Sequence, residues 1–149
     1  MAETIALSKI LRIREKEKMD AEKSYQQSMA FFENIATRLY TLLKRKETVE
    51  SSFESGMQDI IPIEKIKEQV AYIEDLNKQI LNLQAEVNKA RNEMDVEQSK
   101  LTDAHIEVKK FEKMIAHRKQ VKKEVLQKYE NEAMNEISIQ QYLRKQTGE

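Results

Sequence analysis

The sequence predicts an all-α protein in which two long helices form an antiparallel coiled-coil hairpin. Its 149 residues include only 2 glycines and 1 proline. Turns depend on such residues, so the chain can reverse direction only once or twice. In addition, 35% of the residues are charged, against about a quarter in an average globular protein. This composition is typical of long helices with most of their surface in solvent.

The positions of the helix breakers predict where the chain reverses. Neither Gly nor Pro occurs between Ala2 and Ser55. Gly56 suits the C-terminal end of a helix, and Pro62 suits a first helical turn, where its missing N–H costs nothing. We expect one coiled-coil domain over residues 1–149, with helix one over 4–54, a loop over 55–61 and helix two over 62–144.

Apolar residues recur every seven positions, as they do along the seam of a coiled coil. In the second helix one seam position is occupied by Ile66, Ile73, Ile80, Val87, Met94, Leu101, Val108 and Ile115. Eight heptads exceed the three or four that indicate a coiled coil. The weaker seam of the first helix consists of Leu7, Leu11, Ala21, Tyr25, Phe32, Ile35, Leu39, Leu42, Val49 and Phe53.

Matching the two seams predicts a register and an overhang. If the numbers of paired residues sum to about 115, Leu39 meets Leu76 and the bulky Tyr25 meets the small Ala90. Helix one then ends opposite Phe111, and helix two continues over residues 112–144 without a partner in the chain. Apolar residues return in this second helix beyond its basic seam positions, which predicts that another molecule covers them.

The sequence offers little material for catalysis or for ligand binding. There are no cysteines, and the two histidines, His105 and His117, are isolated from any second ligand. No glycine-rich phosphate loop or nucleophile motif occurs. Acidic residues are scattered among basic ones at the spacing of helix surface pairs. We therefore expect no enzyme activity, no catalytic or metal-binding residues and no cofactor.

Charge and hydropathy restrict the partners and the location. The 26 basic and 26 acidic residues balance, which removes the general electrostatic attraction to nucleic acid. Residues 109–128 include eight basic and two acidic residues, as expected for a solvated face or for a docking patch for an acidic protein surface. No apolar run approaches the roughly 20 residues of a membrane span, and the N-terminus does not resemble a signal peptide.

Over essentially its whole length the chain resembles the FliJ family of flagellar export proteins. The opening segment LSKILRIREKEKMDA (7–21) and the loop segment SGM (55–57) are similar to those of the family. So is the central segment VAYIEDLNKQI (70–80). The most specific similarities are IEVKKFEKMIAHRK (106–119) and NEISIQQYLRK (135–145).

The resemblance implies a non-catalytic, stalk-like component of the bacterial flagellar type III export apparatus. Such a protein binds the hexameric export ATPase, promotes its assembly and activity, and links it to the membrane-embedded export gate and to export chaperones. The resemblance also implies a cytoplasmic location at the inner face of the cell membrane at the flagellar base. Membrane association would occur through partners only.

Carried over by position, the resemblance implies two binding surfaces. The surface for the export gate consists of Tyr72, Leu76, Gln79 and Leu83. The family commonly has Phe at the position of Tyr72, and Leu76 and Leu83 are also seam residues. The surface for the ATPase is expected at the end with both termini, at Leu7, Ile10, Leu11, Arg14, Val108, Phe111, Arg118, Lys122 and Tyr129.

Three other interpretations remain open from the sequence. The chain could be a structural coiled coil that self-associates through its long helix. It could be a prefoldin-like holdase that grips unfolded proteins with its apolar helix tips. It could also be the equivalent stalk of a virulence-type secretion system, which the physical properties of the sequence do not distinguish from the flagellar one.

Overall fold

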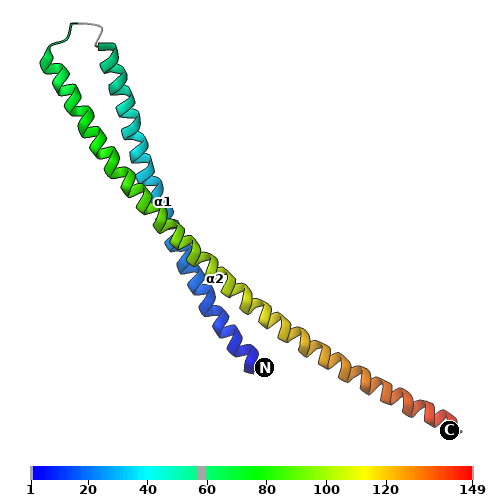
Figure 1. The fold of residues 1–149 in the computed structure, drawn as a ribbon. Helices are drawn as coiled ribbons and strands as arrows, with labels where there is room; N and C mark the ends of the chain where they lie inside the picture. The colour runs from blue at the N-terminus through cyan, green and yellow to red at the C-terminus, as the bar shows by residue number, and fades with distance from the viewer. Residues whose placement is uncertain (1, 57–59, 149) are drawn as a thin grey trace. The chain divides into compact units, whose positions relative to one another are not determined.

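The computed structural model describes residues 2–56 and 60–148. Nearly all of them belong to two helices, α1 (Ala2–Gly56) and α2 (Ile63–Gln146) (Figure 1). The helices pack against each other, and the described residues contain no strand. The predicted all-α helical hairpin is therefore confirmed.

The helix ends follow the helix breakers. Helix α1 contains no proline and ends at Gly56, two residues beyond the expected end at 54. Pro62 directly precedes α2, and its carbonyl oxygen accepts hydrogen bonds from the backbone N–H groups of Lys65 (3.1 Å) and Ile66 (3.3 Å). Pro62 therefore supplies the first acceptor of α2 while donating nothing itself. Of the expected loop 55–61, residues 57–59 lie outside the described residues.

The chain forms two compact units. The central unit comprises Met19–Asp103, and the terminal unit comprises Met1–Lys18 together with Ala104–Glu149. Each unit contains a stretch of α1 packed on a stretch of α2. The expectation of a single domain over residues 1–149 stays a prediction.

The core of the central unit is the coiled-coil seam. Its buried residues are Ile35 of α1 and Leu76, Ile80 and Ala90 of α2, and Leu76 is only 1% exposed. Every seam position of α2 from residue 66 to residue 97, at alternating spacings of three and four, is buried or half-buried. Most residues between them are exposed, so burial follows the heptad period of the sequence.

In the terminal unit α2 continues past the start of α1. Leu7 and Val108 are buried there, and Glu3 of α1 forms an ion pair with Arg118 of α2. Every residue from 119 to 148 is exposed. We call residues 119–146 of α2 the overhang. The expected start of the unpaired stretch at residue 112 was wrong, because Glu112 and Ile115 are half-buried and Arg118 still has a partner in α1.

The register of the two helices also differs from the predicted one. In the central unit the guanidinium of Arg91 lies 5.8 Å from the ring centre of Phe32, and Ala90 lines one hollow with Phe31 and Ile35 rather than with Tyr25. The numbers of facing residues sum to about 122, one heptad away from the predicted register. The predicted register was wrong because a seven-residue repeat matches equally well after a shift of seven.

Candidate functional site

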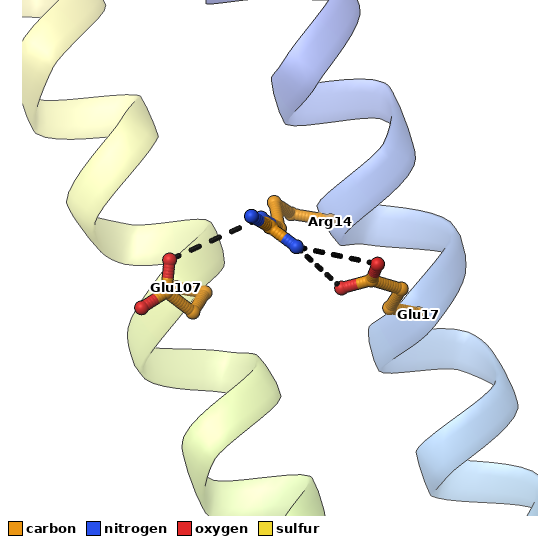
Figure 2. A network of polar contacts seen from close by, with 3 residues as sticks. All are labelled: Arg14, Glu17 and Glu107. Carbon is orange, nitrogen blue, oxygen red and sulfur yellow. Dashed lines mark hydrogen bonds and ion pairs between the residues drawn. The ribbon is translucent and has the colours of Figure 1, made fainter.

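Arg14 occupies a seam position of the terminal unit and connects the two helices (Figure 2). Its Nη1 donates to Oε2 of Glu17 at 3.0 Å, and its Nε lies 3.9 Å from Oε2 of Glu107 on α2. The guanidinium also lies 5.8 Å from the ring centre of Phe111. The distance of 3.9 Å is too long for a hydrogen bond, so the buried Nε has no acceptor within the described chain. Arg14 therefore has electrostatic partners, but its buried Nε–H group lacks a hydrogen bond.

We expect the substitution Arg14→Leu to raise the free energy of unfolding by about 1 kcal/mol. Polar seam residues specify register at a cost in stability, and replacing a partly buried ion pair by an apolar side chain is often stabilising. Urea denaturation measures the change. Arg12→Leu is the matched control, because Arg12 is exposed on the same helix and its replacement buries nothing. A lower midpoint for Arg14→Leu would contradict the interpretation.

The residues expected to bind the ATPase fall into two groups. Those of the first group help to close α1 on α2, where they are buried, half-buried or paired within the chain: Leu7, Ile10, Leu11, Arg14, Val108, Phe111 and Arg118. Lys122 and Tyr129 form the second group, which lies on the overhang in contact with solvent. The first group lies at the contact between the two helices, and only the second group lies wholly in contact with solvent.

The overhang exposes many large apolar side chains. Their exposed fractions lie between 43% and 72% for Val121, Val125, Leu126, Tyr129, Met134, Ile137, Ile139, Tyr142 and Leu143. Sequence reasoning from the seam missed three of these residues, Val121, Met134 and Ile139. The side-chain hydrogen bonds in this stretch are local, such as that from Gln120 Nε2 to Glu124 Oε1 at 3.2 Å.

The residues expected to contact the export gate differ in their accessibility. Tyr72 is 43% exposed, whereas Leu76 is only 1% exposed and belongs to the core. Gln79 is exposed and donates a hydrogen bond from Nε2 to Oδ2 of Asp75 at 2.9 Å. Leu83 is half-buried. Three of the four side chains are therefore accessible to a partner, whereas Leu76 is buried.

A groove of about 520 Å³ lies beside Gln79 and Leu83 in the central unit. The groove is formed by both helices and is lined by Asn34, Thr37, Arg38, Thr41 and Leu42 of α1 and by Gln79, Asn82 and Leu83 of α2. Sequence reasoning missed the side of the groove on α1. Only the correct register brings these α1 residues next to Leu83.

The part of the chain that the structure describes lacks two features. No helix there is long and apolar enough to cross a membrane. No group of three or more His, Cys, Asp or Glu side chains in the same part of the chain could hold a metal ion.

Comparison with known proteins identifies the family. The family model described as "Flagellar FliJ protein" matches residues 3–147. This chain belongs to the FliJ family. Among curated relatives, the flagellar FliJ protein of Bacillus subtilis (strain 168) is 34% identical over 145 residues, which cover 96% of this chain and 97% of the relative. No solved structure matches.

FliJ-family membership makes this chain a flagellar export protein. The predicted resemblance is thus confirmed over nearly the whole chain. The FliJ assignment favours the flagellar system over a virulence-type system, a generic scaffold or a holdase. The overhang and the groove are the two surfaces of this FliJ-family chain that sequence and structure single out.

Proposed function

We propose that this FliJ-family protein is a non-catalytic stalk of the flagellar type III export apparatus. It binds the hexameric export ATPase, promotes its assembly and activity, and links it to the export gate and to export chaperones. It acts in the cytoplasm at the inner face of the cell membrane, where its partners hold it. The observation that supports the proposal most is the overhang, a long helical stretch without a partner in the described chain.

The composition of the overhang suits burial in another protein. Tyr129 is 72% exposed and Val125 is 63% exposed, and such a gathering of exposed large apolar side chains is typical of an interaction surface. A partner that covers them gains roughly 25 cal/mol for each Å² of apolar surface removed from water. Binding of one amphipathic helix in an apolar groove or channel is a common recognition mode.

The basic residues near the start of the overhang suit an acidic partner surface. Lys119, Lys122 and Lys123 are exposed, and none of them has an ion pair in the described part of the chain. Charges of one sign at the edge of an interface accelerate association and select partners. In our proposal Lys122 and Tyr129 contact the ATPase directly, while the buried residues beside them hold the hairpin closed at the base of the overhang.

The second surface is proposed for the export gate. Tyr72, Gln79 and Leu83 are its accessible members, and Leu76 supports them from the core. This surface lies in the central unit, whereas the overhang belongs to the terminal unit. Separate surfaces for the ATPase and the gate would allow one chain to bind both.

Titration of this protein into the flagellar export ATPase of the same organism tests the stalk proposal. We expect the rate of ATP hydrolysis and the light scattered by assembled rings to rise together until the sites are filled. The protein alone, without ATPase, is the control for hydrolysis. An unchanged rate, with the protein alone sedimenting as a stable dimer or trimer, would favour a self-associating scaffold instead.

A further inference from the structure

We propose that, when no ATPase is bound, the overhang pairs with the overhang of a second copy of this chain and that the two helices run antiparallel. The pairing is weak and reversible, and it covers the same apolar side chains that we propose for the ATPase. The inference rests on the proposed ATPase contact only for the competition between the two partners. The pairing itself follows from the charges and the apolar residues of the overhang.

The charge of the overhang changes sign along its length. Residues 119–128 include four basic residues and one acidic residue, whereas residues 129–138 include three acidic residues and no basic one. None of these charged side chains forms an ion pair in the part of the chain that the structure describes. Two parallel overhangs would place like charges side by side. Two antiparallel overhangs place the basic stretch of each copy beside the acidic stretch of the other, so the charges favour this arrangement.

The spacing of the seam places individual residues of the two copies opposite each other. The alternating steps of three and four that bury the seam of α2 continue into the overhang, where they fall on the exposed residues Lys122, Val125, Tyr129 and Glu132. If the numbers of facing residues sum to about 254, Lys122 of each copy faces Glu132 of the other. In the same register Val125 of each copy faces Tyr129 of the other. Both the charged and the apolar seam residues therefore find suitable partners.

The residues beside the seam define the centre of the pair. Leu126 is 54% exposed and lies next to the seam, and the antiparallel register brings its two copies together across the two-fold axis. On the other side of the seam the two copies of Lys128 approach each other. Both are exposed, so these long side chains can turn away into solvent.

The start of α1 limits the length of the pair. In the register described, Glu136 faces Arg118, which already forms an ion pair with Glu3 of its own chain. Beyond this point a second overhang would meet α1. The overlap therefore covers residues 118–136, about 28 Å of helix. Small interfaces are typical of transient complexes, so another partner can displace the second copy.

Competition with the ATPase follows from the residues that the pair covers. Val125, Leu126 and Tyr129 are between 54% and 72% exposed in the single chain, and we propose that the ATPase covers the same surface. A paired overhang cannot bind the ATPase, and a bound overhang cannot pair. Pairing would also protect these apolar side chains from nonspecific association before the ATPase is met.

Sedimentation equilibrium of the full chain between roughly 1 and 300 µM tests the pairing. The average mass should rise with concentration from that of a monomer towards that of a dimer. Lys122→Glu and Glu132→Lys each place like charges at facing seam positions, twice in every pair by symmetry. Each should therefore raise the dissociation constant of the dimer at least about tenfold. The two substitutions combined restore opposite charges and should return the constant to within about threefold of the unmodified chain.

The matched control for the charge change is Lys123→Glu. Lys123 is exposed beside Lys122 but does not occupy a seam position, so its replacement should change the dissociation constant of the dimer by less than about threefold. Circular dichroism should report the same helix content for all variants. An equal loss for Lys122→Glu and Lys123→Glu would indicate a general charge effect and would overturn the pairing of Lys122 with Glu132.

Crosslinking tests the orientation, because the chain contains no cysteine. In the antiparallel pair the two copies of residue 126 meet, so a short bismaleimide should join two chains of the variant Leu126→Cys. Ala133→Cys is the control, since its two thiols lie about 18 Å apart along the axis of the same pair and should not be joined. A parallel pair would allow both variants to be crosslinked. Addition of the ATPase should lower the yield of crosslinked Leu126→Cys.

The outcomes separate the pairing from the proposed function. A chain that stays monomeric up to roughly 300 µM, a trimer, or a double variant as weak as the single ones would overturn the pairing. Crosslinking of both cysteine variants would overturn its orientation. If the dimer forms as expected but the full chain does not stimulate the ATPase, the ATPase contact is wrong and the pairing stands. If stimulation occurs without loss of the crosslink at residue 126, the competition is wrong.

Discussion

Truncation after Lys119 should abolish stimulation of the export ATPase while leaving the hairpin folded. The removed residues are exposed throughout the described range up to residue 148, so their loss exposes little of the hairpin core. They also include the large apolar side chains of the overhang, the surface that we propose for the ATPase. We expect the hydrolysis rate to stay at the level of the ATPase alone, measured over the same titration range as the full chain.

A double substitution separates the effect of the exposed apolar side chains from the effect of the length of the helix. Tyr129→Ser combined with Leu126→Ser keeps the overhang intact and removes two of its exposed apolar side chains. Stimulation should fall at least about tenfold, because two anchors of an interface are lost. Tyr40→Ser is the matched control, since Tyr40 is 61% exposed on α1 in the other unit. Full stimulation by the truncated chain would show that the overhang is not the ATPase contact.

Leu76→Ala should lower the free energy of unfolding by about 3 kcal/mol. Leu76 is 1% exposed, and replacing a buried leucine by alanine costs roughly 2–5 kcal/mol through lost burial and the cavity left behind. The midpoint of urea denaturation measures this cost. Leu81→Ala is the matched control, because Leu81 lies on the same helix and is 65% exposed. Its effect should stay below about 1 kcal/mol.

Leu76→Ala also tests whether Leu76 touches the gate or only supports the side chains that do. If Leu76 only supports that surface, Leu76→Ala should lose gate binding in proportion to the fraction unfolded, and binding should return at a temperature where the variant is folded. A loss that persists in the fully folded variant would mean that Leu76 touches the gate, which requires the hairpin to open locally.

The helices were predictable because their signals are local. Gly56 and Pro62 mark the reversal, and the heptads of α2 identify the residues that the structure buries, including Leu76, Ile80 and Val108. The register was not predictable from the same pattern, since a repeat of seven matches itself after a shift of seven. Side-chain contacts decide it, such as those of Arg14 with Glu107 and of Glu3 with Arg118.

The candidate sites depended on the register in different ways. The free surface at Tyr129 was predictable, because it lies beyond the end of α1 in either register. The groove was not, because Arg38 and Thr41 lie next to Leu83 only when the helices pair as the structure shows. The resemblance to the FliJ family implied residues of α2 and supplied no information about their neighbours on α1.

The pairing of Glu3 with Arg118 also marks where the overhang begins, and the length of the overhang limits how far this protein can reach. The overhang of residues 119–146 extends about 42 Å, at a rise of about 1.5 Å per residue. A slip of one heptad would lengthen or shorten it by about 10 Å without changing the pattern of the seam. In an assembly whose components bind at fixed separations, the register of the two helices therefore determines whether the overhang has the length that its partner requires.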